Sequence, residues 1–160
     1  MSKVFKSHDL SLETKIRLLR CYVYSVLLYG VETWTMKDET EKKLEAFELW
    51  LYRRILKISW TQKITNTEVL RRMNTKPELL KIVKCRKLQY LGHIMRNSDR
   101  YYLLQQILQG KINSKRGPGR RRISWLANLR NWFNMSSAGL FRAATNKVII
   151  AMMIANIRNG

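Results

Sequence analysis

The segment TKPELLKIVKCRKLQYLGHIMR, residues 75–96, decides the fold class of this chain. It begins with Thr75, Pro77 and Glu78, residue types that favour the N-terminus of a helix. Apolar side chains then recur at helical spacing, at Leu79, Val83, Tyr90 and Ile94. The segment therefore predicts a long amphipathic helix.

One residue interrupts the apolar stripe of this segment. Lys87 falls among the apolar positions, where a charged side chain is not expected. Either the helix bends at this point, or Lys87 extends along apolar surface until its ammonium group reaches a phosphate or solvent. The sequence is compatible with both alternatives.

Helical patterns of the same kind follow one another along the rest of the chain. Ser11 and Gly30 stand where a first helix would be capped and ended, and Thr65 forms a capping box with Glu68. The other expected helices cover residues 38–58, 65–74, 99–109, 123–133 and 138–156. The sequence predicts an all-α fold, a helical bundle of about six to seven helices with a basic loop near 111–121.

The second expected helix, 38–58, should pack against the first. Its acidic residues Glu41, Glu45 and Glu48 lie at helical spacing, with Lys42 and Lys43 among them. Interleaved charges of both signs are typical of a solvated helix face. We therefore expect these carboxylates to face water.

The last expected helix, 138–156, is apolar around much of its circumference. One stripe is formed by Leu140, Ala144, Val148, Ala151 and Ala155. It is widened by Ile149, Ile150 and Met153. This width predicts a helix that is buried on two sides or that meets a partner.

The charge of the chain is large and unevenly distributed. Its 160 residues carry 31 Lys and Arg against 11 Asp and Glu, a formal net charge of +20. Residues 1–60 hold 11 basic and 8 acidic side chains, whereas residues 61–160 hold 20 basic side chains and three acidic ones. This asymmetry predicts a polyanionic partner for the second part of the chain.

The basic side chains are densest in KINSKRGPGRRRISW, residues 111–125. Six of them occur without a carboxylate: Lys111, Lys115, Arg116, Arg120, Arg121 and Arg122. Like charges at this density repel unless a polyanion neutralises them, so we interpret these residues as phosphate contacts. A nuclear-localisation patch or an ordinary solvated loop is the alternative.

A second, weaker group of expected phosphate contacts lies on the helix 75–96. It consists of Lys84, Arg86 and Lys87. Trp125 and Trp132, seven positions apart, follow helical spacing and are expected in the core rather than as platforms for nucleic-acid bases.

Residue types that catalysis requires are scarce. Polymerases and many nucleases bind two divalent metal ions with clustered carboxylates, but Glu68, Glu78 and Asp99 are separate from one another in sequence. No glycine-rich phosphate loop follows a strand pattern. We expect no catalytic residue, no metal, no cofactor and no small-molecule substrate.

The cysteines and histidines do not form a motif either. His8 and His93 are the two histidines, and Cys21 is far in sequence from Cys85, whereas structural zinc ligands occur in close pairs. Both cysteines lie within apolar patterns, which predicts buried free thiols in a reducing compartment.

The chain shows no pattern typical of secretion or membrane insertion. Its first residues lack both a signal-peptide pattern and a transit-peptide pattern. The longest apolar stretches, 22–29 and 148–155, are far shorter than the ~20 residues that cross a bilayer. We expect an intracellular protein, nuclear or cytoplasmic, that is not secreted and has no transmembrane segment.

Five segments, in order along the chain, resemble a known family. They are SLETKIRLLRCYVYSVLLYGVETW (11–34), EAFELWLYRRILKISW (45–60), TNTEVLRRM (65–73), RKLQYLGHIMR (86–96) and GPGRRRISWLANLR (117–130). They resemble the C-terminal part of the reverse transcriptase polyprotein of non-LTR retrotransposons, most closely that of RTE- and jockey-like elements. The resemblance covers nearly the whole chain.

In that family this segment lies downstream of the polymerase palm and includes the helical thumb. The resemblance therefore implies a thumb-like helical pair at 1–60, a basic helical region at 61–110, the basic loop at 111–121 and C-terminal helices at 122–160. The family copies RNA into DNA with magnesium held by a pair of palm aspartates, and it uses an endonuclease upstream. Neither the palm motif nor an endonuclease residue occurs in this sequence.

The resemblance implies a function of binding rather than catalysis. The thumb of such a polymerase holds the primer–template, so the expected partner is nucleic acid: an RNA–DNA hybrid, DNA or RNA. The Cys/His knuckle of some related elements is absent, which argues against base-specific recognition. The alternative is a protein-interaction module that uses the apolar C-terminal helix, and a membrane partner is not expected because the densest charges lie in a loop.

Overall fold

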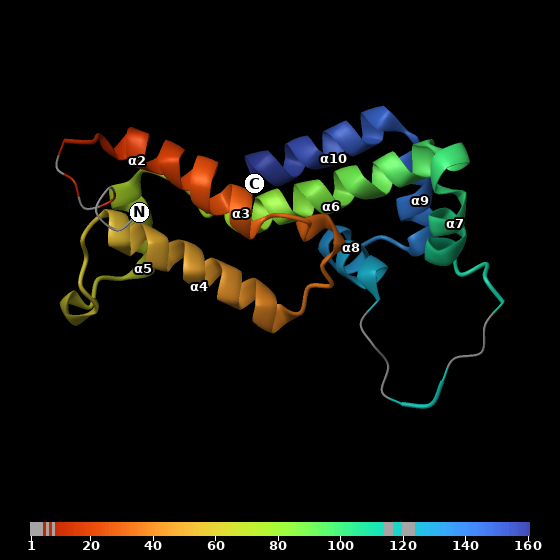
Figure 1. Cartoon of the computed structure of the whole chain (residues 1–160), viewed down its shortest axis with the longest axis horizontal. Helices are drawn as coiled ribbons and strands as arrows, with labels where there is room; N and C mark the ends of the chain where they lie inside the picture. Colours follow the sequence, from red (N-terminus) through yellow and green to blue (C-terminus); the bar gives the residue numbers. More distant parts are fainter. Residues whose placement is uncertain (1–4, 6, 8, 114–116, 120–123) are drawn as a thin grey trace. The chain divides into compact units, whose positions relative to one another are not determined.

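The computed structural model describes residues 5, 7, 9–113, 117–119 and 124–160, which contain helices and no strand (Figure 1). The predicted all-α class is confirmed. The helices longer than one turn are α2 (Leu12–Leu18), α4 (Asp38–Ile55), α5 (Asn66–Met73), α6 (Leu79–Arg96), α7 (Ser98–Gln109), α8 (Trp125–Phe133), α9 (Ser137–Thr145) and α10 (Lys147–Asn159). A π-helical stretch, η1 (Leu19–Tyr24), and the short α3 (Ser25–Leu27) continue α2, and the single turns η2 (Val31–Thr33) and η3 (Trp60–Gln62) lie in connections.

The chain forms two compact units. The first comprises residues 1–30 and 38–82, and the second comprises residues 31–37 and 83–160. Helix α6 contributes its first residues to one unit and the rest to the other. The short segment 31–37 therefore packs in the second unit, whereas the residues before and after it pack in the first.

The expected helix starts at Ser11 and Thr65 are confirmed. The Ser11 hydroxyl accepts a hydrogen bond from the Thr14 backbone N–H at 3.2 Å, and the Thr65 hydroxyl accepts one from the Glu68 backbone N–H at 3.4 Å. Gly30 follows the first helical run with a φ of +63°, a conformation that glycine adopts without strain.

The start of α6 differs from the prediction. The helix begins at Leu79, and the Thr75 hydroxyl bonds the Lys76 carbonyl oxygen instead of capping the helix. The cap comes from α4, because the Glu48 carboxylate accepts from the backbone N–H groups of Glu78 at 2.9 Å and of Leu79 at 3.2 Å. A negatively charged side chain at a helix N-terminus also interacts favourably with the helix dipole.

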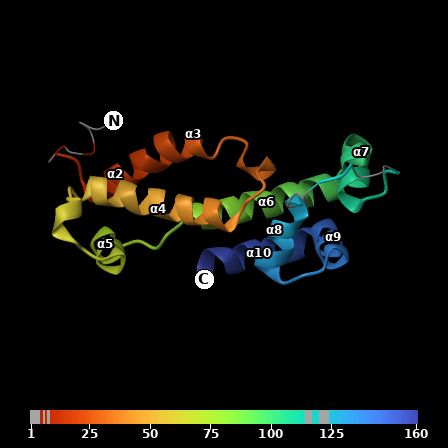
Figure 2. The same ribbon diagram turned by 90° about the horizontal axis from the view of Figure 1, so that it is seen from below.

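Glu48 is not on a solvated face, contrary to the prediction. It is 1% exposed, and its Oε1 also accepts from the Tyr24 hydroxyl at 3.1 Å and the Tyr52 hydroxyl at 2.7 Å. These hydroxyls and the backbone N–H groups of α6 replace the water that a buried carboxylate loses. The Tyr24–Glu48 bond also confirms that the first helical run packs against α4, and the two lie side by side in Figures 1 and 2.

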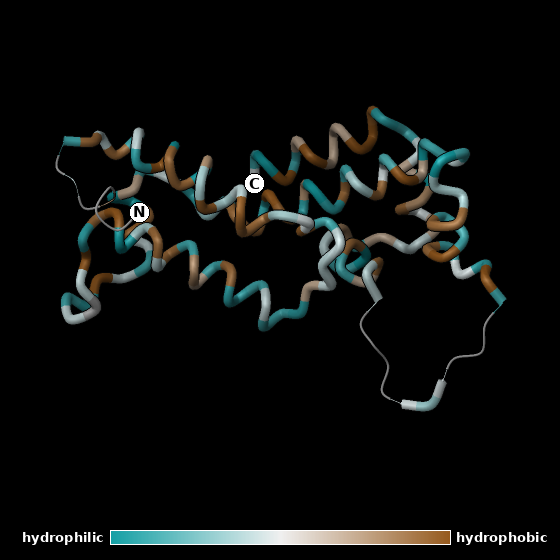
Figure 3. The backbone as a smooth tube through the Cα atoms, in the orientation of Figure 1, coloured by the Kyte–Doolittle hydropathy of each residue, from teal (hydrophilic) through white to brown (hydrophobic). Residues whose placement is uncertain are grey.

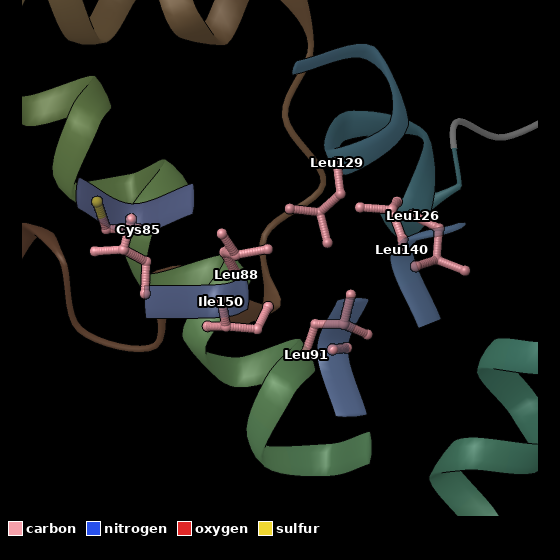
Figure 4. Close-up of a cluster of buried hydrophobic side chains, with 9 residues drawn as sticks. Cys85, Leu88, Leu91, Leu126, Leu129, Leu140 and Ile150 are labelled. Carbon is pink, nitrogen blue, oxygen red and sulfur yellow. The ribbon is translucent and has the colours of Figure 1, made fainter. Parts of the chain in front are cut away.

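In the second unit, leucine and isoleucine side chains from four helices meet in one core (Figure 4). Leu88 and Leu91 come from α6, and the other chief contributors are Leu126, Leu129, Leu140 and Ile150. Trp125 and Trp132 pack against this cluster, which confirms their expected place in the core. Both cysteines are free, but only Cys85 is buried, so the expectation that Cys21 is buried was wrong.

The last predicted helix is broken in two. Asn146 leaves the helical conformation, and its side-chain oxygen accepts from the Val148 and Ile149 backbone N–H groups, so α9 ends there and α10 begins. The two helices meet at 110°. The predicted stripe is confirmed at Leu140 and Ala144, which are buried, and wrong from Val148 onward, because the break shifts the buried face of α10 to Ile150 and Ile154.

Replacing Glu48 by Gln is expected to lower the free energy of unfolding by about 2–4 kcal/mol. The amide loses the charge that four donors share, and its NH₂ group meets backbone N–H groups that need an acceptor. Urea unfolding followed by far-UV circular dichroism measures the change. Glu45→Gln, an exposed position on the same helix, is the matched control and should leave stability nearly unchanged; equal stability of the two variants would contradict the prediction.

Stability is expected to fall above pH 10. Burial, together with the Glu48 carboxylate, raises the pKa of Tyr24 and of Tyr52 above the ordinary value of 10. Below that pH both hydroxyls are protonated in the folded and unfolded chain; above it the unfolded chain loses these protons and the folded chain keeps them. The free energy of unfolding should therefore decline by about 1.4 kcal/mol per pH unit for each tyrosine.

The Tyr24→Phe variant should lose one of these contributions when urea unfolding is repeated from neutral pH to above pH 10. Tyr22→Phe is the control, because Tyr22 is 59% exposed and its hydroxyl is not among the donors to Glu48. A pH dependence that is identical in the two variants would contradict the assignment to Tyr24.

Candidate nucleic-acid interface

The basic residues of the segment 111–122, which we call the basic run, begin directly after α7. Gly110 ends the helix with a φ of +70°, and the Lys111 backbone N–H bonds the Gln106 carbonyl oxygen at 2.9 Å. Lys111 itself is exposed, as are Gly117 and Gly119. The other expected phosphate contacts of this run lie outside the described residues: Lys115, Arg116, Arg120, Arg121 and Arg122.

The second group of expected phosphate contacts, on α6, does not form a uniform basic face. It consists of Lys84, Arg86 and Lys87. Lys84 and Arg86 are half-buried. The Lys84 ammonium lies 5.4 Å from the centre of the Trp132 ring, in the range of a cation–π contact. Their position leaves part of each side chain at the surface of the second unit.

Lys87 does not meet the prediction of a phosphate contact. Its side chain is fully buried, and its ammonium donates to the Trp34 carbonyl oxygen and to Asn128 Oδ1. The same ammonium lies 4.8 Å from the centre of the Trp125 ring and 5.6 Å from that of Trp132. Helix α6 continues without a break past Lys87, and the ammonium does not extend to solvent, which was the second alternative offered by the sequence.

Asn128 completes this buried group. Its Oδ1 accepts from the Met36 backbone N–H at 2.8 Å, and its Nδ2 donates to the Met36 carbonyl oxygen. The Trp125 indole N–H donates to the Glu32 carbonyl oxygen at 2.7 Å. Lys87, Trp125 and Asn128 thus hold the segment 31–37 in the second unit, a role that the sequence analysis missed.

Among the acidic residues of the second part, two are engaged by arginine. The Glu68 carboxylate binds the guanidinium groups of Arg71 and Arg72, each at 2.7 Å, and these hydrogen bonds lower the pKa of Glu68 to about 2. Glu78 pairs with Arg20 at 2.8 Å. Two of the three acidic side chains of the second part are therefore already paired with arginines and are not available to balance the basic run.

Two further properties concern the described residues only. They contain no group of three or more His, Cys, Asp or Glu side chains that could hold a metal ion. No single helix in the described part of the chain is long and apolar enough to cross a membrane, and α9 and α10 reach that length only together, across their 110° bend.

The described residues define an all-α protein of two helical units, in which Lys111, the first residue of the basic run, is exposed at the end of α7. The chain is 29% identical over 119 residues to an uncharacterised transposon-derived protein of Caenorhabditis elegans. The match covers 72% of this chain and 43% of the relative, so the chain spans less than half of that protein's length. No protein-family model matches the chain, and no solved structure does. The similarity supports a transposon-related origin.

Lys87→Met is expected to lower stability, and Lys111→Met is expected to leave it unchanged. Lys87→Met should lower the free energy of unfolding by about 2–3 kcal/mol, because the carbonyl oxygen of Trp34 and Oδ1 of Asn128 lose a charged donor. Lys111→Met should leave stability unchanged, because Lys111 is exposed. Urea unfolding of both variants measures this difference.

In binding to duplex DNA, Lys111→Met is expected to have an effect and Lys87→Met is expected to have none. Lys111→Met should reduce the slope of log affinity against log salt by about 0.9, and Lys87→Met should leave the slope unchanged at a temperature where it is folded. A reduced slope in Lys87→Met would show that Lys87 contacts phosphate after all.

Proposed function

We propose that this chain binds nucleic acid through phosphate contacts and derives from the C-terminal part of a retrotransposon reverse transcriptase. The observation that carries the proposal is the charge of residues 61–160. This part of the chain has 20 basic side chains and three acidic ones, and two of the acidic side chains are already paired with arginine. The transposon-related origin supports the same conclusion. The densest part of this charge, residues 111–122, follows an exposed helix end.

The chemistry favours contact with the backbone over recognition of bases. A guanidinium group can donate two parallel hydrogen bonds to one phosphate, and each neutralised phosphate releases a counterion. Such contacts position a protein on an RNA–DNA hybrid, DNA or RNA without specifying sequence. The proposed contacts are Lys111, Lys115, Arg116, Arg120, Arg121 and Arg122, with Lys84 and Arg86 as a secondary pair.

The proposed role is to hold a nucleic acid while another part of a longer protein acts on it. The curated relative extends beyond the matched region, which covers 43% of its length. The sequence of this chain has neither the palm aspartates nor the endonuclease residues of the retrotransposon family that it resembles. We therefore propose that the chain by itself is not an enzyme.

A second candidate function is protein interaction at α10. Val148 is 66% exposed and Met152 is 61% exposed, one turn apart on the same helix. Apolar colouring recurs along α10 in Figure 3, although only one face of the helix is buried. Contiguous exposed apolar side chains are typical of an interaction surface.

The experiment that tests the proposed function is fluorescence anisotropy with duplex DNA, duplex RNA and an RNA–DNA hybrid across a salt series. The variant Arg120→Ala, Arg121→Ala, Arg122→Ala should bind more weakly, with its salt slope reduced by about one unit for each lost phosphate contact. Arg130→Ala, a change at an exposed arginine on α8, is the single-site control and should retain most of the slope.

Absence of binding to every polyanion at low salt would refute the proposal, as would identical slopes for the triple variant and the wild type. In that case a sedimentation coefficient that rises with protein concentration, and no longer does so in Val148→Ser, Met152→Ser, would favour the second candidate.

A further inference from the structure

The end of α4 carries an aromatic and basic surface that the proposed function does not use. The helix ends at Ile55, and Lys57 adopts a φ of +58° while the Ile58 backbone N–H bonds the Arg53 carbonyl oxygen at 2.9 Å. After this left-handed residue the chain turns back, and Figure 2 shows the connection that leads from α4 to α5. The turn brings the following segment beside the last residues of α4.

Three side chains on α4 form a stack at this end. The Phe47 and Trp50 rings are stacked, with 5.8 Å between their centres and an angle of 22° between their planes. The Arg54 guanidinium lies 5.0 Å from the centre of the Trp50 ring. Trp50 remains 49% exposed, so the stack is accessible from solvent.

A cleft of about 510 Å³ opens beside this stack. It is lined by Trp50, Arg53, Arg54, Ile58, Ser59 and Ile64. Its volume lies in the range of about 300–1,000 Å³ that is typical of sites for small organic groups. Among the described residues, the lining includes two arginines and no acidic side chain.

The walls of the cleft are held in place by hydrogen bonds. Two N–H groups of Arg53 donate to the Ile64 carbonyl oxygen at 3.1 and 3.0 Å, and one of them also donates to Asn66 Oδ1 at 2.6 Å. Arg53 therefore joins α4 to the loop before α5. An adjoining cleft shares Arg53, Arg54, Ile58 and Ser59 and adds the exposed Lys57.

From this arrangement we infer that the cleft at the end of α4 binds an unpaired nucleotide of a single-stranded nucleic acid. The base extends the stack by lying on the outer plane of the Arg54 guanidinium, which Trp50 holds in place, and it contacts the exposed edge of the Trp50 ring. The phosphate accepts hydrogen bonds from Arg54 and Lys57. Aromatic rings and guanidinium planes beside cations are the usual components of sites for single strands. Such stacking tolerates any base.

A duplex does not fit this site. Its bases are paired and stacked on one another, so their faces are not accessible to a ring at the side of a helix. The inference needs none of residues 111–122. It goes beyond the proposed function, because it assigns a second site and a preference for unpaired strands.

The test is fluorescence anisotropy with a labelled single-stranded oligonucleotide and with a blunt duplex of the same length. Trp50→Leu keeps an apolar side chain but removes the ring, and it should weaken binding of the single strand by about tenfold or more while leaving duplex affinity unchanged. Trp50→Phe keeps a ring and should retain most of the affinity. Tyr29→Leu is the control, because Tyr29 is an 86% exposed aromatic residue of the same unit.

A second variant tests the phosphate contact. Lys57→Asn removes the charge and keeps a residue type that tolerates the left-handed conformation, so the fold should persist. The slope of log affinity against log salt for the single strand should fall by about 0.7. Far-UV circular dichroism confirms that each variant is folded.

The inference is overturned if Trp50→Leu binds the single strand as tightly as wild type, if it weakens the duplex equally, or if Tyr29→Leu has the same effect. Failure of the proposed function of the basic run gives a different result. The triple variant at Arg120, Arg121 and Arg122 would then bind the duplex as the wild type does, while Trp50→Leu would still weaken binding of the single strand.

Discussion

The fold of the first unit depends on the buried carboxylate of Glu48. A charge removed from water requires donors that replace its hydration, and here they come from three separate stretches of chain: η1, α4 and the start of α6. Since the acceptor is shared, displacing any one stretch leaves a charged oxygen short of partners. The carboxylate thus specifies which helices meet, whereas apolar contacts alone would accept several arrangements.

Lys87 imposes the same constraint on the second unit with the opposite charge. Its ammonium has a carbonyl oxygen, an amide oxygen and two indole rings around it, and each comes from outside α6. The indole faces supply negative potential without a carboxylate. These contacts compensate the buried charge, and they explain why the short segment 31–37 packs with α8 rather than with the helix that follows it.

Local patterns predicted the class and most helices because caps and apolar spacing are properties of neighbouring residues. Ser11 and Thr65 serve as caps in the structure as they do in the pattern. Glu48 and Lys87 could not be placed in this way, because a buried charge is explained only by partners far away in sequence. Asn146 is intermediate: its residue type is typical of a helix cap, but the continuous apolar pattern around it concealed the break between α9 and α10.

For the candidate interface, the number of lysines and arginines is an upper limit on the number of phosphate contacts that basic side chains make. The structure assigns several basic side chains to internal partners: Lys87 to Trp34 and Asn128, Arg53 to Ile64, and Lys15 to the Ser7 carbonyl oxygen. Each of these would be counted as a contact by composition, yet each stabilises the fold. The lysine at the start of the basic run is exposed, and the three acidic residues of the second part are too few to neutralise the rest. The salt dependence of binding therefore reports on the exposed subset of the charge, and the stability of the two units reports on the buried subset.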